Sequence, residues 1–276
     1  MLTRFRLLLT AAVVPALLLV GGTADAQRFG GFGNACRSNF DEDDYFVSPY
    51  WAGNPLYDGR VTFARIKYKG GYECGREGPG WSHDYPRTDI HFMKIMKEIT
   101  SMRPFVERGP IIGAKVLRLD DPEIFKYPIS YMSEPGGWEP TPAEMKALKN
   151  YITRGGFIIF DDIEGDPSPD YRNLVYQWKR VFPKAIPIRL SNDHPIFNSF
   201  FKIDLSKIPP KIRGYPDPEY MAFFEDNDPK KRMLAIIDNY ADVGELIQFS
   251  DEGFNPVPSN EAYKLWVNYF VYALSH

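Results

Sequence analysis

The chain of 276 residues contains only two cysteines and four histidines. So few cysteines exclude a disulfide-rich scaffold, and their spacing relative to the histidines does not form a zinc motif. Both cysteines, Cys36 and Cys74, lie in glycine-rich irregular sequence. In an oxidising compartment, an even number of cysteines would predict a Cys36–Cys74 disulfide, with two unpaired thiols as the alternative.

The sequence also lacks a block of basic residues and a long hydrophobic run. Its formal net charge is −3, with 33 basic and 36 acidic side chains, so nucleic acid is not an expected partner. The apolar stretch over residues 7–20 is interrupted by Pro15. A membrane-spanning helix needs roughly 20 apolar residues, so this stretch is too short to span a bilayer.

Residues 1–26 instead have the pattern of a secretory signal peptide. Two arginines precede the apolar stretch, and "GGTADA" ends in the Ala24-x-Ala26 motif of a cleavage site. We therefore predict an exported protein, periplasmic or secreted, whose mature chain begins at Gln27 and is not an integral membrane protein. An uncleaved N-terminal anchor is the alternative.

The remaining sequence predicts an irregular N-terminal extension over residues 27–58 and one α/β domain over residues 59–276. The extension is rich in glycine, asparagine and aspartate and has no hydrophobic periodicity. Beyond it, short apolar runs alternate with stretches whose apolar residues recur at helical spacing. This alternation predicts a three-layer α/β sandwich around a mostly parallel sheet.

Individual elements are predicted from local signals. The clearest is the capping box Thr141-Pro142-Ala143-Glu144, which predicts a helix with proline at its first position. Thr88 is predicted to cap a second helix, and Ser168-Pro169 to start a third. A final helix is predicted over residues 260–274. The proline-rich segment 205–218 is interpreted as a flap beside a site or as an insertion. The predicted strands cover residues 61–68, 114–119, 127–132, 157–162, 186–190, 221–224 and 233–238.

The stretch "GGFIIFDD" (residues 155–162) raises the main functional question. Its four consecutive apolar residues predict a strand that is buried on both faces. The strand finishes on Asp161 and Asp162, although burial makes a charge costly. Either these aspartates reach solvent at the edge of the sheet, where they close the strand or cap a helix, or they line a site.

Several other polar residues follow predicted strands. In open α/β sheets, ligands bind beyond the carboxyl ends of the strands, so parallel neighbouring strands would bring these side chains to one edge. The candidate site residues are His83, Asp84, Asp120, Glu134, Asp161, Asp162, Asp193 and His194. A divalent cation is compatible with them, but no motif supports one and no cofactor is predicted.

Aromatic residues lie in or near the same predicted loops. Trp81, Tyr85 and Trp138 are candidates for stacking on a sugar ring, with a place in the hydrophobic core as the alternative.

Six stretches together resemble a bacterial family known as domain of unknown function 4159. They are "WSHDYPRTDIHFMKIMKEIT" (81–100), "LDDPEIFKYPISYM" (119–132), "YITRGGFIIFDD" (151–162), "VFPK" (181–184), "DHPIFNSFF" (193–201) and "NEAYKLWVNYFVYALSH" (260–276). The resemblance runs from about residue 59 to the C-terminus and keeps the order of the motifs. It implies a flavodoxin-like sheet of the class I glutamine amidotransferase-like type, and the family has no established role.

The resemblance also implies what the protein does not do. In amidotransferases, the strand equivalent to "FIIF" leads into a tight turn that presents a nucleophilic cysteine. This chain has Asp161 or Asp162 at that position. A carboxylate cannot replace a thiolate in that chemistry, so glutaminase activity is not expected.

Three functions are consistent with the sequence. The first is a binding or scaffolding module of the cell envelope, whose partner is an unknown small molecule or an envelope protein. The second is a hydrolase, carbohydrate- or metal-linked, in which Asp161 or Asp162 acts as base with His83 or His194 as its partner. The third is an assembly partner whose apolar C-terminal helix docks another subunit.

Overall fold

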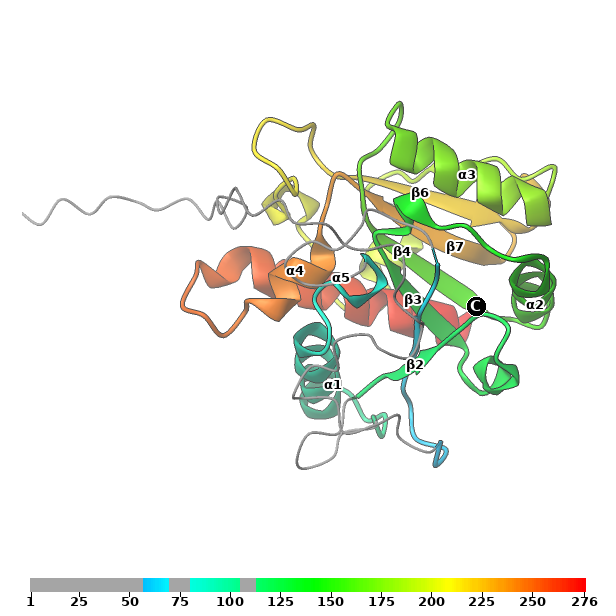
Figure 1. The fold of residues 1–276 in the computed structure, drawn as a ribbon. Helices are drawn as coiled ribbons and strands as arrows, with labels where there is room; N and C mark the ends of the chain where they lie inside the picture. The colour runs from blue at the N-terminus through cyan, green and yellow to red at the C-terminus, as the bar shows by residue number, and fades with distance from the viewer. Residues whose placement is uncertain (1–56, 70–79, 105–112) are drawn as a thin grey trace, which may run out of the picture. The chain divides into compact units, whose positions relative to one another are not determined.

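A computed structural model of the protein describes residues 57–69, 80–104 and 113–276, and these residues belong to one compact unit. In this part of the chain, seven strands form one sheet with helices on both faces (Figure 1). The predicted signal peptide, nearly all of the predicted extension and both cysteines lie outside the described residues. The disulfide therefore stays a prediction.

The sheet has the strand order β2-β1-β3-β4-β7-β6-β5. The first five of these strands are parallel, whereas β6 runs antiparallel to β7 and to β5. The order of the parallel part is that of flavodoxin-like sheets. The strands are β1 (Ala64–Ile66), β2 (Lys115–Leu117), β3 (Ile129–Ser133), β4 (Phe157–Ile163), β5 (Ile188–Arg189), β6 (Glu219–Phe224) and β7 (Met233–Asn239).

Five α-helices of the described chain cover the two faces (Figure 1). One core cluster joins the sheet to α1 (Arg87–Ile99), α4 (Val243–Gln248) and α5 (Pro256–Ser275). A second cluster joins the opposite face to α2 (Pro142–Thr153) and α3 (Pro169–Val181). The predicted three-layer α/β sandwich is thus confirmed.

The helix starts follow the sequence signals in part. The capping box of α2 is present, because Thr141 Oγ1 accepts from the Glu144 amide at 3.2 Å and Glu144 Oε2 accepts from the Thr141 amide at 2.8 Å. The prediction that Thr88 caps α1 is wrong. The helix begins one residue earlier, and the Thr88 hydroxyl donates to the Gly244 carbonyl at 2.7 Å. This bond ties α1 to α4.

The C-terminal helix is longer than predicted and lies largely in the core of its own chain. Leu265, Trp266, Tyr269 and Phe270 are buried against the sheet and α1. Complete burial of this side counts against an exposed docking face for another subunit. In the described ranges, we find no helix whose length and apolar character would let it cross a bilayer.

Candidate functional site

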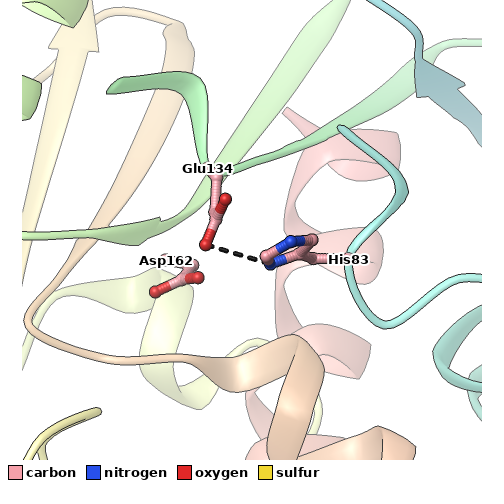
Figure 2. Close-up of side chains that lie close together, drawn as sticks. All are labelled: His83, Glu134 and Asp162. Atoms are coloured by element: carbon pink, nitrogen blue, oxygen red, sulfur yellow. Dashed lines mark ion pairs between the residues drawn. The ribbon is translucent and has the colours of Figure 1, made fainter. Parts of the chain in front are cut away.

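Three of the candidate residues converge at the carboxyl end of the parallel strands. His83, Glu134 and Asp162 each offer one ligand-type atom, and these atoms all lie within 4.8 Å of one another. Figure 2 shows the three side chains pointing toward one another, with His83 Nδ1 at 3.0 Å from Glu134 Oε1. They come from the loop after β1, the turn after β3 and the end of β4.

The topology explains why these segments meet. The neighbours of β1 are β2 on one side and β3 on the other, which makes the β1/β3 position the switch point where open α/β sheets bind ligands. The register then sets Glu134 beside Asp162. Ser133 pairs with Asp161, and the Glu134 amide donates to the Asp161 carbonyl at 3.1 Å.

The backbone is strained at this point of the fold. Asp84, Glu134 and Asp162 have φ angles of 63°, 45° and 61°, in the left-handed region that non-glycine residues rarely adopt. They are three of the six non-glycine residues with positive φ in the described ranges. Such strain persists only where surrounding contacts enforce it, and it concentrates at functional sites.

The buried end of the cluster contains a lysine that the sequence analysis missed. Lys211 Nζ lies 2.5 Å from Asp162 Oδ1, and the two side chains are 10% and 5% exposed. Lys211 belongs to the proline-rich segment 205–218, so this segment lies beside the cluster, as the flap interpretation requires. His83 and Glu134 are 24% and 25% exposed and form the solvent-facing end.

The two carboxyl groups of the cluster differ in the direction of their pKa shifts. Burial raises the pKa of Asp162 to about 7, because it outweighs the attraction of Lys211 and acts together with the negative charge of Glu134. Burial also disfavours ionisation of Glu134, but the hydrogen bond and charge of His83 outweigh it and lower the pKa of Glu134. One carboxyl is therefore charged at neutral pH, while its neighbour holds a proton part of the time.

Arg65 fixes the loop that carries His83. Its fully buried guanidinium forms an ion pair with Asp89, with Nη2 2.8 Å from Oδ2. Nη1 donates to the backbone carbonyls of Trp81 and His83 at 3.2 and 3.1 Å. An arginine inside the apolar run "VTFARIKY" was the available signal, because a buried cation needs partners.

Asp161 points away from this cluster. Its carboxylate accepts hydrogen bonds from the amides of Val243 and Gly244 at 3.1 and 2.7 Å, and from the Tyr131 hydroxyl at 3.1 Å. Asp161 therefore stabilises the first turn of α4, as expected from the alternative in which an aspartate caps a helix. The alternative in which both aspartates reach solvent is excluded, since all seven residues of β4 are buried.

Asp84 lies near both aspartates. It is 4% exposed, and its Oδ2 atom has no hydrogen-bond partner among the described residues. Burial and the charge of Asp162 raise its pKa well above the ordinary value, although Arg65 opposes this. A Cβ atom added to Gly244 would come within 2.6 Å of Asp84 Oδ2, so Asp84 packs against the start of α4.

The expectation that Asp193 and His194 join this edge is wrong. The His194 ring contacts Phe224 and Tyr272, with centroids 6.0 and 5.8 Å away. Phe224 pairs with Met233, the first residue of β7, so His194 lies at the amino end of the parallel strands. The chain reverses after β5, and strand direction alone did not reveal that reversal.

The other candidates also lie outside the cluster. Asp120 is exposed beyond β2 and pairs with Arg118, with Nε 3.2 Å from Oδ1. Trp81 and Trp138 are 5% and 0% exposed and belong to a core cluster, so neither ring is open for stacking on a sugar. Tyr85 is half-buried, and its ring centroid lies 6.2 Å from that of Trp81.

The fold and the cluster together define a doubly wound α/β protein with a polar candidate site at its switch point. Over residues 62–274 the chain matches the family described as "Domain of unknown function (DUF4159)", and it belongs to that family. A comparison with curated proteins found no match. Family membership thus assigns no reaction to the chain.

Proposed function

We propose that this domain is an exported ligand-binding module whose site takes a divalent cation at His83, Glu134 and Asp162. The observation that carries the proposal is the convergence of their ligand atoms within 4.8 Å from three separate segments. One imidazole nitrogen and two carboxylate oxygens suit zinc, manganese or ferrous iron. The partial exposure of His83 and Glu134 gives an ion a path from solvent.

The strain and charge of the cluster support the same proposal. Glu134 and Asp162 hold their carboxyl groups close together on left-handed backbone, and without a metal these groups pair with His83 and Lys211. A divalent ion bound by both carboxyl groups would favour the charged form of each. Three protein ligands would also leave open positions for a ligand or water, as in catalytic metal sites.

Isothermal titration of chelator-treated protein with Mn²⁺ and Zn²⁺ tests the proposal. We expect binding of one ion per chain, lost in Asp162→Asn and in Glu134→Gln. Asp193→Asn is the matched control, because Asp193 is exposed and lies outside the cluster. Absence of binding by the unchanged protein, or equal losses in the control, would refute the cation site.

Hydrolysis is the second candidate function, favoured by the pKa of Asp162 at about 7. In the metal-free site, a carboxyl that titrates near neutrality suits general acid–base catalysis. In a cation-bound site, Asp162 would instead be a ligand, and the cation would activate water. His83, through Glu134, is the partner in this proposal, since His194 lies at the other end of the sheet. Generic phosphate esters, carboxylate esters and glycosides would be assayed with and without Mn²⁺. Turnover that is abolished in Asp162→Asn but kept in Asp193→Asn supports it, and turnover that survives in both contradicts it.

The exported location is proposed from residues 1–26 alone. Expression of the whole chain in a bacterial host, followed by N-terminal sequencing of the envelope fractions, provides the test. We expect a mature N-terminus at Gln27. A full-length chain retained in the cytoplasm would contradict export and would remove the cell envelope as the source of its ligand or partner.

A further inference from the structure

We infer that Lys211 acts as a tethered ammonium group in the cation site: it pairs with Asp162 when no metal is bound, and it binds a phosphate or carboxylate group of the ligand when a metal is present. This inference rests on the proposed cation site. It names the class of ligand as a small anion or an anionic group of a larger molecule.

The first part follows from the contact between Lys211 and Asp162. Asp162 is one of the three proposed metal ligands, and its Oδ1 atom lies 2.5 Å from Lys211 Nζ. With both side chains nearly excluded from water, this charge pair is only weakly screened. A divalent cation that binds Asp162 must compete with the ammonium group and is repelled by it.

The second part follows from how the Lys211 backbone is held. Its amide donates to the Tyr240 carbonyl at 2.7 Å, and the Tyr240 amide donates to the Ile163 carbonyl, also at 2.7 Å. Tyr215 in the same segment donates its hydroxyl proton to Glu164 Oε1 at 2.9 Å. These bonds fix the segment to the chain just beyond β4, so a displaced ammonium group stays next to the site.

The ligand class follows from placing an ammonium group beside a metal with open positions. Phosphate and carboxylate oxygens bind divalent cations and also accept charge-assisted hydrogen bonds from lysine. A neutral sugar hydroxyl would gain little from the lysine charge. The burial of Trp81 and Trp138 also removes the aromatic platform that a sugar would need.

Titration of the chelator-treated protein with Mn²⁺, alone and with inorganic phosphate, acetate or glucose, tests the inference. We expect phosphate or acetate to tighten Mn²⁺ binding about tenfold, and glucose to have no effect. Lys211→Met should bind Mn²⁺ about tenfold more tightly than the unchanged protein and should lose the anion effect. The matched control is Lys207→Met in the same segment, where an exposed lysine pairs with Asp204 at 3.4 Å.

The possible outcomes separate this inference from the cation site itself. If neither the unchanged protein nor Lys211→Met binds Mn²⁺, the cation site is wrong. If Mn²⁺ binds but Lys211→Met changes neither the affinity nor the anion effect, the role of Lys211 is wrong and the cation site stands. Equal tightening by glucose would also refute an anionic ligand. Should Lys211→Met not fold, Lys211→Gln removes the charge and keeps a hydrogen bond to Asp162, with the same results expected.

Discussion

Asp161 and Asp162 are adjacent, identical and buried, yet they lie in two different surroundings. Asp161 faces the start of α4 and is bonded to two amides and one hydroxyl. Asp162 faces Lys211 and Glu134, and its own backbone is left-handed. Burial alone therefore does not identify a functional carboxylate. The kind of partner does: neutral fixed donors indicate a structural role, whereas titratable and partly exposed partners indicate a site.

The strand itself sends the two side chains apart. Successive residues of a β-strand point to opposite faces, and the pairing of β4 with β7 shifts between Phe160 and Ile163. A local irregularity of this kind commonly redirects a side chain at a functional edge. The comparison predicts that changes at Asp161 reduce stability, whereas changes at Asp162 reduce ligand binding.

The largest effect is expected for Asp161→Ala. Two amides at the start of α4 and the Tyr131 hydroxyl of β3 would lose their buried acceptor, and we expect a loss of about 4 kcal/mol in the free energy of unfolding. Urea denaturation measures this loss. Asp162→Asn is the paired variant. It keeps an oxygen that accepts from Lys211, so it should lose less stability, but it should lose all Mn²⁺ binding. A larger loss of stability at Asp162 than at Asp161 would reverse the assignment of the two roles.

Arg65→Lys should have the next largest effect, about 3 kcal/mol of unfolding free energy. Lysine cannot reproduce the forked contacts with Asp89 and with the carbonyl of His83. Mn²⁺ affinity should also fall, because the loop that carries His83 loosens. Arg60→Lys is the control, since Arg60 pairs with Asp58 at the surface. An unchanged Mn²⁺ affinity in folded Arg65→Lys would show that Arg65 does not position the site.

Part of this comparison was predictable from the sequence. The apolar run before Asp161, the capping box at Thr141 and the alternation of elements are local signals. They predict the three layers and the mostly parallel sheet. Because parallel strands end at a common edge, His83, Glu134 and Asp162 were predicted to lie together. Which face each aspartate occupies depends on contacts with α4 and Lys211, and no local pattern encodes those.

The residues that sequence reasoning missed or misplaced share one cause. Lys211 and Arg65 act through partners more than fifteen residues away, reached by loops without periodicity. His194 was misplaced because the chain reverses after β5 and packs against α5. Periodicity predicts which residues form an element, but the path of an irregular segment is decided by tertiary contacts.

Gly244→Ala should destabilise the fold by about 2 kcal/mol, because it would add an atom to the packed contact between the start of α4 and the side chains of Asp84, Tyr131 and Asp161. The new Cβ would lie 2.6 Å from Asp84 Oδ2, 2.7 Å from the Tyr131 hydroxyl and 3.3 Å from Asp161 Oδ2. Thermal and urea denaturation measure the loss. A change below about 0.5 kcal/mol would mean that the start of α4 moves freely, and that Asp161 does not hold it.

The pH dependence of the metal-free protein should report on Asp162. Its pKa in the folded state, about 7, lies above the ordinary value of 3.8, so the folded state binds the proton more tightly than the unfolded state. This contribution to stability is fully present below the ordinary pKa and is lost as pH rises toward 7. Asp162→Asn should flatten this fall by at most about 1.4 kcal/mol per pH unit. Asp226→Asn, at an exposed aspartate with a lowered pKa, is the control. Equal slopes for Asp162→Asn and the unchanged protein would contradict the shift.

The smallest effect is expected for Tyr68→Phe, which removes one hydroxyl beneath the site. This hydroxyl donates to the carbonyls of Ser133 and Glu134, at 2.8 and 2.6 Å. Its loss should cost about 1 kcal/mol of unfolding free energy. Because these bonds hold the left-handed backbone of Glu134, Mn²⁺ affinity should fall as well. Tyr176→Phe, at a ring that is 62% exposed, should change neither quantity. If Tyr68→Phe lowers stability but leaves Mn²⁺ affinity intact, the left-handed backbone of Glu134 contributes to the stability of the fold and not to cation binding. Of the two regions compared, only Asp162 would then be assigned to ligand binding.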